Sequence, residues 1–124
     1  MSSWLAIAAG GALGAVLRYA VSTATYALLG RGFPWGTLVV NVAGSLLMGL
    51  LYVLLVERLG LGPHWRAALL VGLLGAFTTF STFSLETFAL VEEGAWALAA
   101  ANVVASVLLC LTAVWAGIVL GRAF

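Results

Sequence analysis

The sequence contains no lysine and no aspartate, and its 124 residues carry a net charge of only +1 from five arginines and four glutamates. The charged share is 7%, whereas a soluble globular domain has about 25%. A charge this small gives no electrostatic footprint for a polyanion, so we expect no nucleic-acid partner. The composition also argues against an ordinary soluble enzyme and against a disordered segment.

Cysteine and histidine are almost as scarce, because Cys110 and His64 are the only residues of their types. A single cysteine excludes an intrachain disulfide and a cysteine cluster for a metal ion. Glu86 has no acidic neighbour in the sequence, and neither a phosphate loop nor a metal-binding motif is present. The sequence therefore lacks the parts of an active site, and we predict that the chain is not an enzyme.

Apolar residues make up 65% of the chain, more than a protein of this size can hide from water. We therefore predict an all-α membrane protein forming a single domain over residues 1–124. A spanning helix takes about 20 residues, and the apolar regions lie at about 4–29, 36–56, 65–91 and 95–120. Four spans enclose too little volume for a pore, so the functional unit is expected to be an oligomer.

Four spans place both termini on the same side of the membrane. Outside the spans that side carries Arg58, Arg66 and Arg122, and the opposite side carries Arg31. Because positive residues favour the cytoplasmic side, this distribution leans toward cytoplasmic termini. Three arginines against one is a small bias, so insertion in both orientations stays open on the charge pattern alone.

The third apolar region differs from the others because it is rich in hydroxyl groups. Six of the fifteen serines and threonines of the chain lie between Thr78 and Thr87. Such a density at membrane depth predicts a helix broken near residues 75–79. Non-helical backbone is tolerated there only where it is buried in protein or lines a wet cavity.

Two polar side chains lie inside the first and second spans, where they are costly unless protein surrounds them. Arg18 is interpreted either as an electropositive element near an anion vestibule or as the partner of Glu86 in an ion pair, unless it snorkels to the surface. Asn41 is interpreted either as a donor to a bound anion or water, or as one side of an interhelical hydrogen bond. The sequence does not decide between these alternatives.

The third region also carries a stripe of phenylalanines, Phe77, Phe80 and Phe83, spaced to share one face of a helix. This pattern is typical of a core or a lipid-facing surface, but here hydroxyl residues are interleaved with it. An aromatic ring has a positive edge and a negative face. Ring edges therefore suit an anion and ring faces suit a cation, so geometry decides the sign of the ion.

The last span carries Asn102, Ser106 and Cys110, which are spaced by four and align along one side of a helix. Alone, this polar track is typical of contacts between membrane helices. Together with Asn41 and the hydroxyl-rich third region, it indicates one wall of a water-filled path.

Three segments resemble the fluoride channels of the CrcB (Fluc) family, small prokaryotic fluoride exporters, and the resemblance covers nearly the whole chain. They are GGALGAVLRY at 10–19, GTLVVNVAGS at 36–45 and, most specifically, GLLGAFTTFSTFSLE at 72–86. The resemblance implies four transmembrane helices per subunit with the third broken. It also implies an antiparallel dual-topology homodimer with two fluoride pores and a structural Na⁺ at the dimer centre.

The resemblance also implies roles for individual residues. The backbone carbonyls of Gly75 and Thr78, two from each subunit, are expected to hold the Na⁺. The residues expected beside the fluoride pore, through ring edges, the amide or hydroxyl groups, are Asn41, Phe80, Ser81, Thr82, Phe83, Asn102 and Ser106. Arg18 and Glu86 stay open between a vestibule and an ion pair.

The function implied is passive export of fluoride across the prokaryotic cytoplasmic membrane, which lowers intracellular fluoride. A strongly hydrated anion needs successive donors that replace its water and still release it, and uncharged donors fit that need. The main alternative is a small multidrug-type exporter that exchanges protons for a cationic drug. It needs a carboxylate in the membrane, and the first span has none. The polar path argues against a third alternative, a purely structural assembly protein.

Overall fold

Helices make up almost all of residues 2–124, which are the residues that the computed structural model describes. The part of the chain so described contains no strand. In chain order the elements are α1 (Ser3–Leu29), α2 (Trp35–Tyr52), η1 (Val53–Arg58), α3 (Pro63–Arg66), η2 (Ala67–Leu74), α4 (Gly75–Phe77), α5 (Phe80–Glu92) and α6 (Trp96–Ala123). The segments η1 and η2 are π-helical, a wider turn that is common near functional sites.

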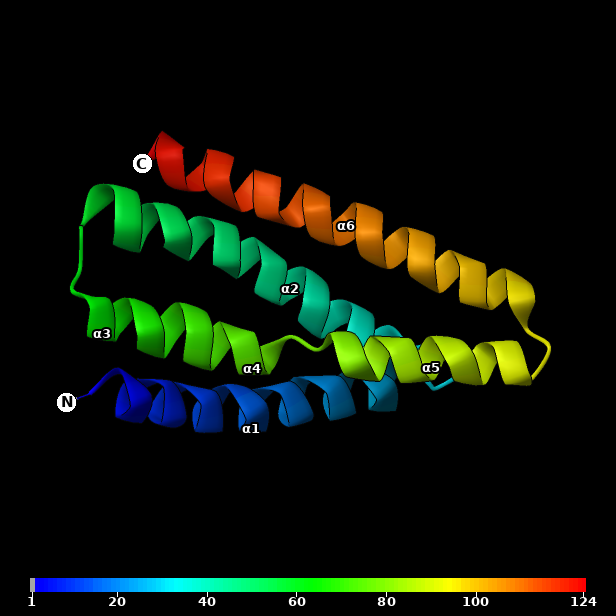
Figure 1. The fold of residues 1–124 in the computed structure, drawn as a ribbon. Helices are drawn as coiled ribbons and strands as arrows, with labels where there is room; N and C mark the ends of the chain where they lie inside the picture. The colour runs from blue at the N-terminus through cyan, green and yellow to red at the C-terminus, as the bar shows by residue number, and fades with distance from the viewer. Residues whose placement is uncertain (1) are drawn as a thin grey trace.

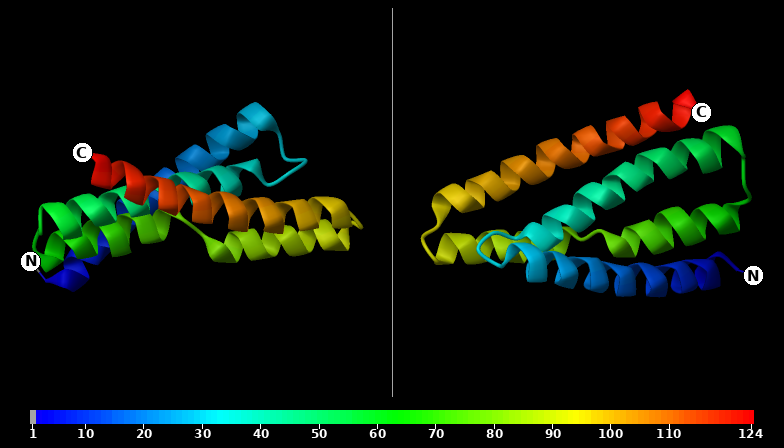
Figure 2. Two further views of the ribbon diagram at one scale, coloured as in Figure 1. Left: turned by 90° about the horizontal axis from the view of Figure 1, so that it is seen from above. Right: turned by 180° about the vertical axis from the view of Figure 1, so that it is seen from behind.

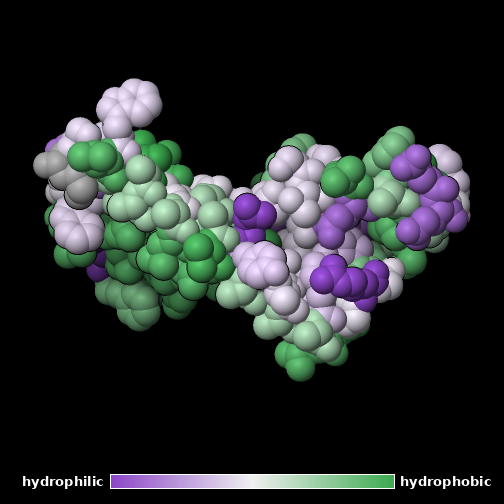
Figure 3. Space-filling view, turned by 90° about the horizontal axis from the view of Figure 1, so that it is seen from below, coloured by the Kyte–Doolittle hydropathy of each residue, from purple (hydrophilic) through white to green (hydrophobic). Residues whose placement is uncertain are grey.

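Four of the resulting helical segments are long and apolar enough to cross a membrane. They are Ser3–Leu29, Trp35–Arg58, Pro63–Glu92 and Trp96–Ala123. The prediction of an all-helical protein with four membrane spans is therefore confirmed. On the face drawn in Figure 3, apolar residues cover much of the surface, and the hydrophilic ones gather over the half that carries α5.

The first helix begins and ends where its sequence provides caps. The Ser2 hydroxyl accepts a hydrogen bond from the Leu5 N–H at 3.3 Å, which satisfies a free donor of the first turn. At the other end Gly30 adopts φ 81°, and its N–H donates to the Tyr26 carbonyl. This conformation favours glycine, so the chain leaves α1 at residue 30 and turns into α2.

Glycines hold α1 against the first half of the third segment. A Cβ atom at Gly10 would lie 2.0 Å from the Ala68 carbonyl oxygen, and one at Gly14 would lie 2.1 Å from that of Leu73. Only a residue without a side chain permits such an approach, and small residues are what bring membrane helices together. Because Gly10 and Gly14 are spaced by four, α1 follows the third segment toward residue 75.

The third segment exchanges its packing partner along its length. Its first half, from α3 to α4, packs against α1, whereas α5 packs against α6. Figure 1 shows α4 and α5 joined by a short non-helical thread, and the left view of Figure 2 shows α5 diverging from the line of α1. Two extended residues therefore let one apolar segment contribute to both sides of the bundle.

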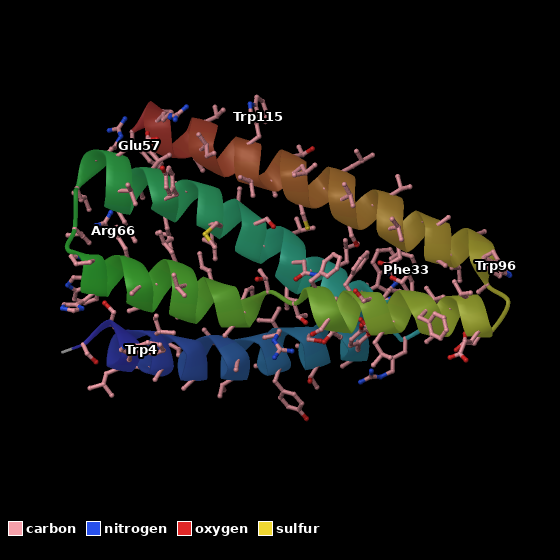
Figure 4. The ribbon with its side chains drawn as sticks, in the orientation of Figure 1. Trp4, Phe33, Glu57, Arg66, Trp96 and Trp115 are labelled. Atoms are coloured by element: carbon pink, nitrogen blue, oxygen red, sulfur yellow. The ribbon has the colours of Figure 1, made fainter. Side chains whose placement is uncertain are left out.

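The two ends of the bundle carry several of the charged and tryptophan residues. Figure 4 shows Trp4, Glu57 and Arg66 at the end that also holds both termini, and Trp96 at the opposite end. Tryptophan is enriched at membrane–water boundaries, so these positions agree with spans running from end to end. At the first end Arg122 Nη2 and Glu57 Oε2 form an exposed ion pair at 3.0 Å.

Candidate functional site

The site is built around the two residues between α4 and α5, Thr78 and Thr79, which we call the interruption. Thr78 has φ −90° and ψ 159°, and Thr79 has φ −152° and ψ 116°, so both are extended. The Thr79 hydroxyl then caps α5 by accepting from the Thr82 N–H at 3.1 Å. The helix thus stops at Phe77 and restarts at Phe80 with its new N-terminus capped.

Asn41 on α2 bridges to the interruption with both polar atoms of its amide. Its Oδ1 accepts from the Thr79 N–H at 2.7 Å, and its Nδ2 donates to the Thr79 carbonyl at 3.0 Å. One of the two Asn41 N–H groups is committed to this contact. The structure thus contains the interhelical hydrogen bond that was one interpretation of Asn41, while the side chain also lines a cavity described below.

The interruption diverts the donors that would serve the carbonyls of Gly75 and Thr78 in a continuous helix. The Thr79 N–H, which would donate to Gly75, donates to Asn41 instead. The Thr82 N–H, which would donate to Thr78, donates to the Thr79 hydroxyl. Gly75 is exposed and Thr78 is half-buried. Both carbonyls therefore lie near the protein surface without their usual helical donors.

A first cavity of about 380 Å³ lies on one side of the interruption, between α2, α5 and α6. The rings of Phe80 and Phe83 are 5.3 Å apart between centroids and tilted by 43°. Phe83 is buried, whereas Phe80 is 77% exposed and forms the outer wall. The lining residues are Asn41, Gly44, Ser45, Met48, Thr78, Thr79, Phe80, Phe83, Ser106, Val107, Cys110, Leu111 and Val114.

The polar track on α6 contributes to this cavity only in part. Ser106 and Cys110 line it, but Asn102 is fully buried beside α5. The Asn102 amide donates to the Thr87 hydroxyl at 2.8 Å and accepts from the Ser106 hydroxyl at 3.3 Å. Asn102 therefore joins α6 to α5 and orients Ser106.

A second cavity, of about 320 Å³, lies on the other side of the interruption, against α1. Arg18 and Thr82 both line it, so the structure separates Thr82 from the phenylalanines with which the sequence had grouped it. Ser81 is exposed, lines neither cavity, and lies 3.3 Å from the Thr79 hydroxyl. The lining residues are Ala15, Arg18, Tyr19, Ser22, Thr37, Val40, Thr79 and Thr82.

Glu86 does not pair with Arg18. Its carboxylate accepts hydrogen bonds from the Tyr26 hydroxyl, at 2.7 Å, and from the Thr37 hydroxyl. Arg18 instead donates through Nε to the Ala76 carbonyl at 3.0 Å. Within residues 2–124 the one ion pair is Arg122 with Glu57. The suggested Arg18–Glu86 ion pair is wrong, because hydroxyls on α1 and α2 bind the carboxylate and the Ala76 carbonyl binds Arg18.

Sequence reasoning missed Tyr26 and Thr37, whose hydroxyls are the hydrogen-bond partners of Glu86. One signal was available, because Arg18, Ser22 and Tyr26 are spaced by four and follow one side of α1. They extend the line of Gly10 and Gly14 past the interruption. Thr37 carried no comparable signal, since its role depends on how α2 crosses α5.

Comparison with known proteins gives a consistent result over nearly the whole chain. Residues 5–118 match the family model described as CrcB-like protein, Camphor Resistance (CrcB). The chain is 60% identical over 120 residues to a protein of Methylococcus capsulatus named "Fluoride-specific ion channel FluC". Proteins with the same name in Magnetococcus marinus and Shewanella amazonensis are each 56% identical to it.

The length covered differs among these relatives. The alignment takes in 97% of this chain but 53% of the Methylococcus protein, so the chain spans about half of that relative. It takes in 97% of this chain and 96% of the Magnetococcus protein, and 94% of both chains for Shewanella. A family match over 5–118 and identities of this size settle the family. This chain belongs to the CrcB family, and the resemblance read from its three motifs is confirmed.

Proposed function

We propose that this chain forms a fluoride-selective channel that releases fluoride passively across the prokaryotic cytoplasmic membrane and so lowers intracellular fluoride. Its relatives named as fluoride-specific ion channels support this at 56–60% identity. They also support the prediction that the chain is not an enzyme, and they give no support to a multidrug exporter. The structural observation that carries the proposal is the first cavity, which combines an amide, hydroxyls and two phenyl rings at membrane depth.

The chemistry of the first cavity suits a small anion that must not be trapped. Asn41 has an N–H that its contact with Thr79 does not use, and Phe80 and Phe83 provide ring edges, which carry partial positive charge. None of the lining residues is charged. A pathway of this kind replaces the hydration of fluoride stepwise while keeping each interaction weak enough for release.

The working unit in this proposal is an antiparallel dual-topology homodimer with two pores. Phe80 and Gly75 are both exposed in the single chain, although they flank the interruption halfway along the third segment. A polar interruption at that depth has to be covered by protein rather than lipid. A second copy provides such a cover and closes the outer wall of each first cavity.

The same proposal treats the interruption as the break of the third span and as the site of a structural Na⁺. The donor set fits, because the Gly75 and Thr78 carbonyls have lost their helical donors and carbonyl oxygens suit a hard cation. Gly75 and Thr78 of each copy would hold the ion. Its chemistry there would be to neutralise carbonyl dipoles that meet at the centre of a dimer.

Fluoride efflux from liposomes tests the function directly. The purified chain is reconstituted into vesicles loaded with potassium fluoride, and valinomycin is added so that potassium balances the charge. We expect rapid fluoride release and almost no chloride release from matched vesicles loaded with potassium chloride. Equal release of both anions, or release of neither, would contradict the proposal. Proton-driven uptake of a cationic dye without fluoride release would favour the multidrug exporter instead.

A further inference from the structure

Arg18 is the only charged residue that contacts the backbone next to the interruption within residues 2–124. Its Nε donates to the Ala76 carbonyl at 3.0 Å, across from α1 to α4. The contact follows from the packing of α1, because Gly10 and Gly14 bring this helix to backbone contact with Ala68 and Leu73. Arg18 comes four residues after Gly14, so the same side of α1 reaches Ala76.

The hydrogen bond replaces one that the interruption removes. In a continuous helix the Ala76 carbonyl would accept from the Phe80 N–H, but the extended residues Thr78 and Thr79 carry Phe80 onto a new helix. A carbonyl left without a donor at membrane depth costs free energy. Arg18 supplies a charged donor at this point, and charged hydrogen bonds are the stronger ones.

Arg18 and Asn41 hold the interruption from opposite sides. Arg18 fixes the Ala76 carbonyl from α1, and Asn41 fixes both the N–H and the carbonyl of Thr79 from α2. The Gly75 carbonyl comes just before the first of these fixed points, and the Thr78 carbonyl lies between them. The peptide groups that carry these two oxygens therefore have little freedom to turn.

We propose that Arg18 is a positioning residue for the cation site, which acts by fixing the Ala76 peptide so that the Gly75 and Thr78 carbonyls are preorganised for Na⁺. This inference rests on the proposed function and on its Na⁺ site. It gives Arg18 a role through the backbone rather than as a ligand of the permeating anion. A guanidinium suits this role, because its donors are held in a rigid plane, unlike those of an ammonium group.

The test measures how sodium stabilises the full chain. Wild-type protein and Arg18→Gln are purified in detergent at high sodium, since a ligand of the folded state stabilises it by mass action. Thermal unfolding is then followed while sodium replaces N-methylglucamine at constant ionic strength. We expect the sodium concentration for half of the stabilisation to rise about tenfold in Arg18→Gln, the size of effect given by losing a charged hydrogen bond.

Arg122→Gln is the matched control, because Arg122 also lies on a helix and also bonds through its guanidinium, but at the exposed end. Its sodium half-saturation should equal that of the wild type. If Arg18→Gln does not fold, Arg18→Lys decides the question. Lysine keeps the charge without the planar guanidinium, so a raised half-saturation supports the proposal and an unchanged one overturns it.

The outcomes separate this inference from the proposed function. An Arg18→Gln protein that loses fluoride efflux but keeps the wild-type sodium half-saturation would mean that Arg18 acts only on the anion, and this would overturn the positioning role. A wild type without any sodium stabilisation would also overturn it. Fluoride efflux from the same wild-type preparation tests the channel function independently in either case.

Discussion

The two cavities beside the interruption share Thr79 but differ in chemistry. The first cavity contains phenyl rings, an amide and several hydroxyls, and no charged residue lines it. The second contains Arg18 and the hydroxyls of Ser22, Thr37 and Thr82. An anion would bind more strongly beside a fixed positive charge and would leave it more slowly. The difference indicates that one cavity suits passage, whereas the other suits attraction of ions and support of the backbone.

The largest effect is expected where α1 packs against the third segment, just before the α1 residues that line the second cavity. Gly14→Val would place side-chain atoms against the Leu73 backbone, which already lies 2.1 Å from an added Cβ. Because backbone cannot move aside as a side chain can, we expect the free energy of unfolding to fall by about 3 kcal/mol or more. Thermal unfolding in detergent measures this.

The control for Gly14→Val is Gly62→Ala, where an added Cβ meets nothing within 4 Å. It should leave the unfolding temperature unchanged. A Gly14→Val protein as stable as the wild type would show that α1 can move away from the third segment, and the close packing would then not be needed to place the α1 residues of the second cavity.

The next effect concerns the first cavity alone. Phe83→Ile removes a ring edge and roughly keeps the apolar bulk, so we expect fluoride efflux to fall about tenfold with folding intact, in line with the strength of aromatic edge contacts. Phe80→Ile should behave alike. The measurement is the initial efflux rate from liposomes at equal protein content.

Phe88→Ile is the matched control, since Phe88 lies on the same helix, is 59% exposed and lines neither cavity. Its efflux should match the wild type. If Phe83→Ile also matched the wild type, the phenylalanines would serve packing only. The assignment of ion passage to the first cavity would then be contradicted.

A smaller effect is expected from Thr82→Val, which removes one hydroxyl from the second cavity with little change of shape. Loss of a single neutral hydrogen bond, about 1 kcal/mol, corresponds to a roughly fivefold lower efflux rate. The liposome assay compares it directly with Phe83→Ile. If the efflux rate fell more in Thr82→Val than in Phe83→Ile, the ion would pass through the second cavity rather than the first.

The smallest effect is expected at the end of the bundle, far from both cavities. Glu57→Gln breaks the ion pair with Arg122. The side chain of Glu57 is 34% exposed and that of Arg122 is 61% exposed. Exposed ion pairs contribute little because water screens them. We therefore expect the fluoride efflux rate and the unfolding temperature to stay unchanged, and a clear loss of either would give the charged end a role that the cavities do not explain.

The sequence predicted the spans well because hydropathy is a local property. Four apolar segments appear in the structure close to the expected ranges. Local composition sufficed for the spans, because no other part of the chain decides whether a segment is apolar. Glycine followed by dense hydroxyl residues predicted a helix broken near 75–79, and Thr78 and Thr79 are the extended residues between α4 and α5. That they break a membrane span stays a prediction.

The grouping of side chains was harder to predict because it depends on how helices cross. Thr82 was expected beside the phenylalanines but faces the second cavity. Thr82 comes one residue before Phe83 and two after Phe80, about 100° and 200° around a helix, so its position could have shown that it lies on another side of α5. The partners of Glu86 come from two other helices, so no pattern within α5 could identify them.

The length of the interruption has a consequence for the direction in which α5 presents its side chains. Thr78 and Thr79 are extended, so inserting or deleting one residue between Phe77 and Phe80 would change the direction in which α5 leaves the interruption and its rotation about its own axis. Such a change would turn other residues of α5 toward α6, although every residue of α5 stayed the same. The number of extended residues between α4 and α5 therefore helps to decide which side chains of α5 line the first cavity.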